Sequence, residues 1–151
     1  MNKKQKSLTN KGFSLVELII VIAIMAVLIG VLAPQYLKYV ERSRNSTDKN
    51  NASAMVSAVQ VWGAETEIPS SSKALVADAA GSAGTTVKVT ASSNVAFSGT
   101  NADAIQDALE NAGISLSTHC SSKTAWTEYT LTFNVDANGI VSAACDKFDL
   151  D

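Results

Sequence analysis

Residues 11–34 read KGFSLVELIIVIAIMAVLIGVLAP, and the interpretation of the whole sequence depends on this stretch. Glu17 is the only charged residue between Phe13 and Ala33. About 20 apolar residues in a helix that rises ~1.5 Å per residue span ~30 Å, which is the thickness of a bilayer core. The stretch therefore predicts a transmembrane helix over 13–34.

The segment before the apolar stretch is basic, with four lysines and no acidic residue ahead of Gly12. Positive charge keeps such a leader in the cytoplasm, so we expect the C-terminal part to be exported. A cleaved secretory signal fits poorly, because the apolar run is long for such a signal and no Ala-x-Ala-like site follows it. An uncleaved membrane anchor fits the hydropathy as well as a processed precursor does.

Glu17 is unusual because a charged side chain in the hydrocarbon region costs about 2.5–3.5 kcal/mol on insertion scales. Its place near the cytoplasmic end would reduce that cost by snorkelling. Two interpretations stay open from the residue alone: an acid tolerated near the interface, or an acid that waits for a partner.

Residues Lys11 to Ile24, KGFSLVELIIVIAI, resemble the class III signal of type IV pilins and the related pseudopilins. The resemblance covers about residues 11–40. It implies that a prepilin peptidase cleaves after Gly12 and N-methylates Phe13. It also implies that Glu17 neutralises the Phe13 amine of a neighbouring subunit. Unpaired burial of a charge is costly, so such pairing would fix the register of assembly.

Gly30 and Pro34 lie four residues apart near the end of the apolar stretch. Proline removes a backbone donor and kinks a helix. The resemblance implies that helical order between these two residues is lost inside a filament, and the alternative is a simple bend at the membrane surface.

Apolar residues continue the helical pattern beyond Pro34, at spacings of three and four. They are Ala52, Met55, Val56, Val59 and Trp62. The pattern predicts one long helix over 13–62. The polar stretch 41–51 leaves a linker as the alternative.

The remainder of the chain predicts a small head of helices and antiparallel strands. Residues 126–135 and 140–145 flank the turn signal DANG at 136–139 and predict a hairpin. A helix is expected to begin at Thr100 or Asn101 and to stop at Gly113. The other expected elements are a short helix over 70–80, a strand over 85–90 and a weaker strand over 91–97.

The chain has two cysteines, Cys120 and Cys145. Export favours a disulfide between them, and two unrelated buried thiols are the alternative. A bond closing a loop of ~26 residues would stabilise the head by about 3–4 kcal/mol. The resemblance implies the same bond, since many pilins close a C-terminal loop in this way.

Composition and motifs point away from catalysis. Beyond the leader, eight basic residues face fourteen acidic ones, which argues against a nucleic-acid binder. The single histidine, His119, offers no zinc cluster or catalytic triad, and no phosphate-binding loop occurs. Asp146, Asp149 and Asp151 form an acidic tail that we interpret as solvated rather than calcium-binding. We therefore expect no enzyme, metal or cofactor.

These expectations combine into an α+β type IV pilin fold, with a long N-terminal helix packed on a small antiparallel sheet. The expected parts are a cleaved leader (1–12), a transmembrane and assembly helix (13–34), its amphipathic second half (35–63) and a head (64–151). The resemblance implies a structural subunit of a type IV pilus, acting in adhesion, motility or aggregation. A pseudopilin of a type II secretion or competence system is the alternative, and a membrane-anchored binding domain is a more distant one.

The same resemblance implies the partners and the location. Partners would be copies of the chain, the prepilin peptidase, an assembly ATPase and inner-membrane platform proteins. The chain would sit in the lipid bilayer of the cytoplasmic membrane before assembly and in an extracellular pilus afterwards.

Overall fold

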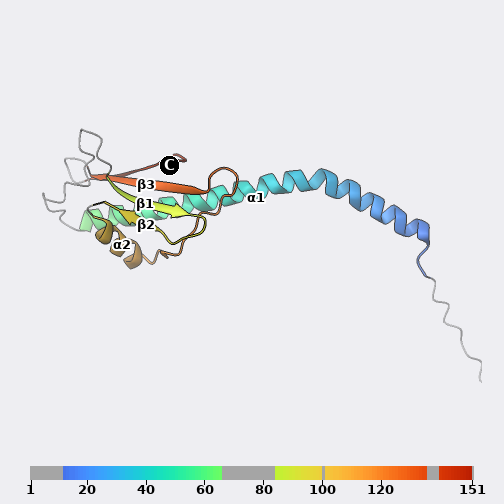
Figure 1. The fold of residues 1–151 in the computed structure, drawn as a ribbon, viewed down its shortest axis with the longest axis horizontal. Coiled ribbons are helices and arrows are strands. Elements are labelled where there is room, and N and C mark those ends of the chain that lie inside the picture. The colour runs from blue at the N-terminus through green and yellow to red at the C-terminus, as the bar shows by residue number, and fades with distance from the viewer. Residues whose placement is uncertain (1–11, 66–83, 100, 136–139, 151) are drawn as a thin grey trace, which may run out of the picture. The chain divides into compact units, whose positions relative to one another are not determined.

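The computed structural model describes residues 12–65, 84–99, 101–135 and 140–150. The elements, in chain order, are α1 (Leu15–Glu65), β1 (Thr85–Thr90), β2 (Ala96–Ser98), α2 (Ala102–Asn111), β3 (Glu128–Val135) and β4 (Val141–Cys145), as Figure 1 shows. The predicted leader, the helix over 70–80 and the turn over 136–139 lie outside the described residues. Contacts divide the chain into two units, Met1–Tyr39 and Val40–Asp151, and α1 runs through both.

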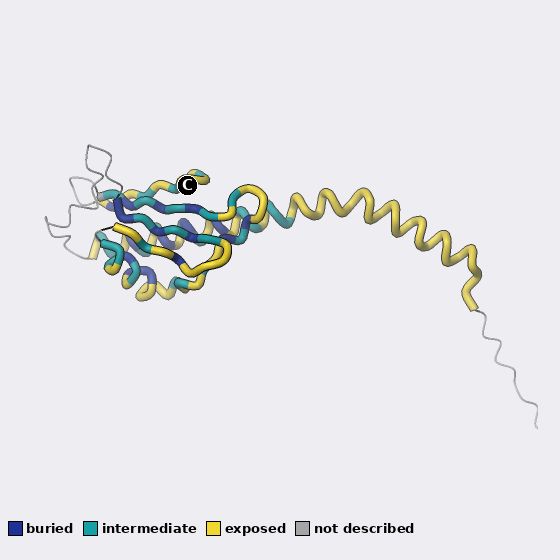
Figure 2. The backbone as a smooth tube through the Cα atoms, viewed as in Figure 1, coloured by how far each residue is buried: buried dark blue, intermediate teal, exposed yellow. Residues whose placement is uncertain are grey.

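The first unit consists, where it is described, of an apolar helix that is exposed along its whole length (Figure 2). The most apolar 18-residue window of α1 has a mean hydropathy of 3.1, and none of it is buried. Within the described ranges, α1 is the one helix long and apolar enough to cross a membrane. The structure thus confirms the predicted apolar helix.

α1 is one continuous helix of 51 residues. It passes through the polar stretch 41–51, so the linker alternative is wrong. It also passes through Pro34, which has no N–H to donate to the carbonyl of Gly30 one turn earlier. The proposed loss of helical order between Gly30 and Pro34 inside a filament stays a prediction.

The second unit contains a four-stranded antiparallel sheet with the order β2-β1-β3-β4. β1 occupies the predicted residues 85–90. β3 and β4 form the predicted hairpin, with Val135 opposite Val141 and Leu131 opposite Cys145.

One hydrophobic core joins the inner face of this sheet to both helices. Tyr129, Leu131 and Phe133 alternate along β3 and are fully buried, as a half-buried strand requires. The other fully buried members are Val87 and Val89 of β1, Ala52, Met55 and Val59 of α1, and Ile105 and Leu109 of α2. The structure therefore confirms the α+β fold, with the second half of the long helix packed on an antiparallel sheet.

α2 ends as predicted, and Asn101, one of the two predicted N-cap residues, occupies its N-cap position, while Thr100 lies outside the described residues. At its C-terminus Gly113 has a φ of 77°, and the N–H groups of Gly113 and Ile114 donate to the carbonyls of Glu110 and Leu109. This is a Schellman motif, which favours glycine at the left-handed position. At its N-terminus, the side chain of Asn101 makes no capping bond.

Three strands are shorter than predicted, and β4 lacks only Ile140. β2 occupies only residues 96–98, because the Val95 N–H donates to the carbonyl of Leu116 instead of joining a strand ladder. β3 begins at Glu128 rather than Trp126. Trp126 is held by a different set of contacts, described below.

Val59 and Val61 of α1 provide a matched test of this core. Val59 is fully buried and Val61 is 56% exposed. We expect Val59→Ala to lower the free energy of unfolding by about 2 kcal/mol, since two buried methyl groups are lost. Val61→Ala should change it by less than about 0.5 kcal/mol. Urea unfolding of the detergent-solubilised chain measures both, and equal effects would contradict the packing of α1 described here.

Candidate functional site

The predicted processing site lies immediately before α1. Gly12, Phe13 and Ser14 precede the helix, and Phe13 is 93% exposed. The Gly12–Phe13 peptide bond is therefore accessible. Nothing else in the described part of the first unit packs against it, because that part is a single helix and its start.

Glu17 has a structural role that the sequence analysis missed. The N–H of Ser14 donates to Glu17 Oε2 at 2.9 Å, and the N–H of Val16 donates to Ser14 Oγ at 3.4 Å. The first is the bond that the acid makes in a capping box, whose signature is Ser or Thr followed three residues later by Glu or Gln; the Ser14 hydroxyl accepts from the N–H of Val16 instead of Glu17. The signal was present in the sequence as S-L-V-E.

This capping box directs the Glu17 carboxylate back toward the start of the helix. Negative charge is favourable there, because the helix dipole is positive at its N-terminus. Glu17 therefore lies on the side of Phe13, where cleavage after Gly12 would create an amine.

The structure does not contain the predicted disulfide, since Cys120 and Cys145 are both free. Cys120 is buried, and its thiol donates to Asp48 Oδ2 at 3.3 Å. Burial, followed by the Asp48 carboxylate, raises the pKa of the Cys120 thiol to about 12. Burial also raises the pKa of the Cys145 thiol, at the end of β4.

Asp48 is a fully buried carboxylate on α1. Besides the thiol, it accepts hydrogen bonds from the N–H groups of Ser121 (2.7 Å) and Ser122 (2.9 Å) and from the indole Nε1 of Trp126 (2.8 Å). A buried charge is tolerated when it is fully hydrogen-bonded in this way. The Trp126 ring packs in turn against Phe148, with ring centroids 5.0 Å apart.

Glu41 lies seven residues before Asp48, which places the two carboxylates on the same face of α1. Its Oε1 atom accepts from the Ser122 hydroxyl (2.7 Å) and from the N–H groups of Lys123 and Thr124 (2.8 Å each). Its Oε2 atom lies 3.5 Å from the guanidinium of Arg44. The Ser122 hydroxyl, followed by the Thr124 and Lys123 N–H groups, holds the pKa of the Glu41 carboxyl far below its usual range.

We call this arrangement the carboxylate clamp: Glu41 and Asp48 of α1, with the loop 120–126. Successive backbone N–H groups converge on each acid, as in an anion-binding nest. The clamp explains why β3 begins late, since Trp126 is bound to α1 rather than to the sheet. It fastens this loop to α1.

Sequence reasoning missed both acids, although one signal pointed to them. The buried face of α1 contains Ala52, Met55 and Val59. Extended backward at helical spacing, the same face reaches Asp48 and then Glu41. Acids on the core-facing side of a helix require donors from elsewhere in the chain.

The other polar residues singled out in the sequence lie apart from the clamp. His119 is exposed. Asp146 accepts the Thr130 N–H at 2.7 Å and lies 3.5 Å from Lys147 Nζ. In the ranges that the structure describes, no group of three His, Cys, Asp or Glu side chains could hold a metal ion.

Asp48→Asn tests the clamp directly. An asparagine keeps one acceptor oxygen but turns an NH₂ group toward groups that are themselves donors. We expect the free energy of unfolding to fall by about 3 kcal/mol. Asp107→Asn, which changes an exposed acid of α2, should have little effect in the same denaturant titration. Equal stability of the two variants would contradict the clamp.

Glu41 predicts a specific dependence of stability on pH. Its pKa is depressed in the folded chain, so its contribution is complete above the unfolded value near 4.5 and is lost as the pH falls toward the folded value. Stability should therefore decline below about pH 4.5 in the native chain. Glu41→Gln should be less stable at neutral pH and should show a shallower decline. Parallel stability curves for the two proteins would show that Glu41 is not responsible.

Comparison with known proteins agrees with the N-terminal geometry. Residues 8–33 match the family model described as the prokaryotic N-terminal methylation motif. The chain is 34% identical, over 105 residues, to prepilin peptidase-dependent protein A of Clostridium perfringens, and the alignment covers 66% of each chain. No solved structure matches the chain.

Two relatives named as type IV major pilins are similar over the N-terminal part. A type IV major pilin protein of Myxococcus xanthus is 41% identical over 49 residues, which cover 32% of this chain and 22% of the relative. A type IV major fimbrial protein of Dichelobacter nodosus is 40% identical over 50 residues, which cover 33% and 32%. The chain thus aligns with less than a third of each pilin. Together, the methylation motif and these relatives show that the chain belongs to the superfamily of type IV pilins and pseudopilins.

Proposed function

We propose that this chain is the precursor of a structural subunit of a type IV pilus. The observation that carries the proposal is the exposed apolar helix of the first unit, preceded directly by the accessible Gly12–Phe13 bond. Such a helix needs lipid before assembly and other copies of itself afterwards. The two relatives named as major pilins support a pilus as the assembled form.

Processing would occur at the Gly12–Phe13 bond. Hydrolysis by a prepilin peptidase removes the leader and leaves an α-amine on Phe13. N-methylation of this amine keeps the positive charge and adds apolar surface. A positive charge beside a helix N-terminus is unfavourable, so the amine gains from a nearby carboxylate.

Glu17 would supply that carboxylate to a neighbouring subunit. Its own chain already places it in the first turn, through the bond from Ser14. Each subunit would then present both an acid and an amine at the same level of the helix. In an apolar filament interior, only a register that pairs them avoids an uncompensated buried charge.

The subunit would reside in the cytoplasmic membrane before assembly and in an extracellular filament afterwards. Its partners would be the prepilin peptidase, an assembly ATPase and platform proteins of the membrane. Adhesion, motility or aggregation would follow from the assembled filament.

A pseudopilin is the second candidate function. The observation that favours it is the Clostridium perfringens relative, which is similar over 105 residues and whose name refers to peptidase processing and not to a pilus. Electron microscopy of sheared surface filaments, with peptide identification, distinguishes a surface pilus from a secretion pseudopilus.

Two substitutions of Glu17 separate its capping role from its charge. Glutamine also serves at this position of a capping box, so Glu17→Gln keeps the helix start and removes only the charge. We expect both Glu17→Gln and Glu17→Ala to insert and to be cleaved, and both to assemble poorly. Filament yield after shearing measures assembly, and mass spectrometry of the mature N-terminus should show methylated Phe13 in each variant.

The outcomes are distinct. Normal filament yield from Glu17→Gln would exclude a role for the charge. If mass spectrometry finds the Gly12–Phe13 bond uncleaved in the native chain, processing is excluded, and the pilus proposal is excluded with it.

A further inference from the structure

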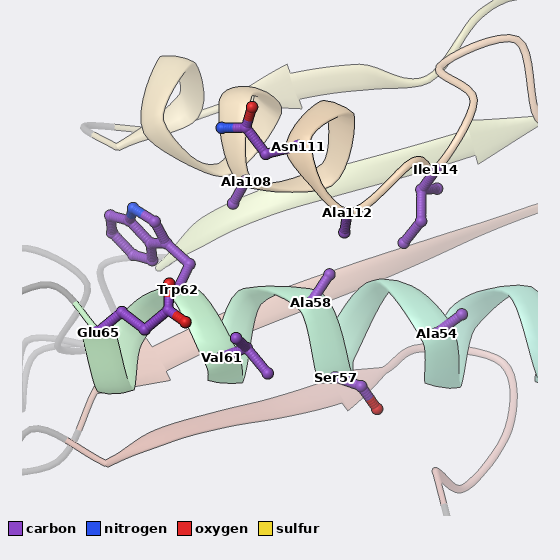
Figure 3. Close-up of a pocket in the computed structure, with 10 residues that line it drawn as sticks. All are labelled: Ala54, Ser57, Ala58, Val61, Trp62, Glu65, Ala108, Asn111, Ala112 and Ile114. Atoms are coloured by element: carbon purple, nitrogen blue, oxygen red, sulfur yellow. The ribbon is translucent and has the colours of Figure 1, made fainter.

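A groove of about 600 Å³ lies between the C-terminal part of α1 and α2, entirely within the second unit. Figure 3 shows Ala58 and Trp62 of α1 directed toward Ala108 and Ala112 of α2. Among the lining residues that the structure describes, Glu65 is the one that carries a charge. The groove is therefore apolar along its walls and negative at its end.

The outer face of α2 extends this negative charge. Asp103, Asp107 and Glu110 are all exposed and are spaced four and three residues apart, so they lie on one face of the helix. α2 has no basic residue. A partner for this region should therefore carry positive charge on a narrow surface.

The same chain carries such a surface on α1. Arg42 and Lys49 are exposed and lie seven residues apart. The clamp leaves this face positively charged. The two acids of the same stretch, Glu41 and Asp48, are directed toward the loop 120–126 instead. The stretch is mixed in sequence, but its exposed residues Arg42 and Lys49 project together from one flank of the helix, where Lys49 Nζ lies 5.9 Å from the centroid of the Phe148 ring.

The groove and the basic face lie on opposite sides of α1. A helix turns ~100° per residue. Measured from the core-facing direction of Asp48, Arg42 and Lys49 project at ~+100° to +120° and the groove residues Ala54 and Ala58 at ~−80° to −120°. A copy can thus use both surfaces at once, each with a different neighbour.

We propose that the groove and the acidic face of α2 receive the Arg42–Lys49 face of α1 from a second copy of this chain. The charges are complementary and equally spaced, since Arg42 and Lys49 are seven residues apart, as are Asp103 and Glu110. Two different surfaces on one molecule make a heterologous contact, which continues from copy to copy as an open filament unless it closes into a ring. This inference rests on the proposed pilus function and names a contact between heads.

Charge exchange within the full-length chain tests the contact. Arg42→Glu with Lys49→Glu should lower the yield of sheared filaments by roughly tenfold, because like charges then face each other. Glu65→Lys with Glu110→Lys should do the same. All four substitutions together restore opposite charges and should recover most of the yield. The control exchanges another exposed pair, Lys88→Glu with Glu128→Lys, and should leave the yield unchanged.

Carboxyl-to-amine cross-linking of native filaments gives an independent readout. Filaments grown from a mixture of ¹⁵N-labelled and unlabelled chains should yield a mixed-isotope peptide pair that joins Lys49 to Glu65, Asp107 or Glu110. Detergent-solubilised monomers should not yield it. A Lys49 link in which both peptides always carry the same isotope would place the contact within one chain and overturn the proposal.

The two proposals fail differently. Filaments at native yield from the Arg42→Glu, Lys49→Glu variant, or no recovery in the fourfold variant, would overturn this contact and leave the pilus function standing. An unprocessed N-terminus and no filaments from the native chain would overturn the pilus function itself. A Lys49 link to a different protein in surface preparations would assign the basic face to another partner and also overturn the contact.

Discussion

The constraint on which the rest of the structure depends is an apolar helix that has no partner within its own described unit. Each large apolar side chain that stays in water forgoes about 1.5–3 kcal/mol of burial. Over five turns this exceeds the net stability of an ordinary domain, about 5–15 kcal/mol. The helix therefore requires a covering of lipid or of other apolar helices, and the proposed role of Glu17 in aligning copies of the chain follows from that requirement.

The carboxylate clamp extends this logic to the second half of α1. A helix that runs on from a membrane-spanning segment needs an anchored head, and hydrophobic packing begins only at Ala52. Glu41 and Asp48 prolong the contact by about three turns with hydrogen bonds instead of apolar burial. Because both acids face inward, the exposed charges of this stretch that remain on the flank with Arg42 and Lys49 are basic. The same bonds thus fasten the loop 120–126 and determine the charge that the helix presents outward.

Local patterns predicted the parts of the fold that depend on local physics. The strand 85–90, the β3–β4 hairpin and the glycine stop at Gly113 follow from alternation, turn residues and capping, and the structure confirms them. The clamp was not predicted, because its partners lie more than 70 residues apart and serine or lysine N–H donors carry no local signature. The sequence identified the residues of the N-terminal site. The capping role of Glu17 was missed, because its charge alone was considered and not its spacing from Ser14.

The clamp and the expected disulfide are two ways of fastening the same segment. A disulfide would act on the unfolded chain by closing a loop, and it forms only where thiols are oxidised. In this structure the Cys120 thiol instead donates to Asp48, with its pKa raised to about 12, a state that disfavours the reactive thiolate. A fastening made of hydrogen bonds to carboxylates needs no oxidant. For Glu41, whose pKa is depressed by these bonds, acid rather than reductant is the condition that would weaken its hold on the loop.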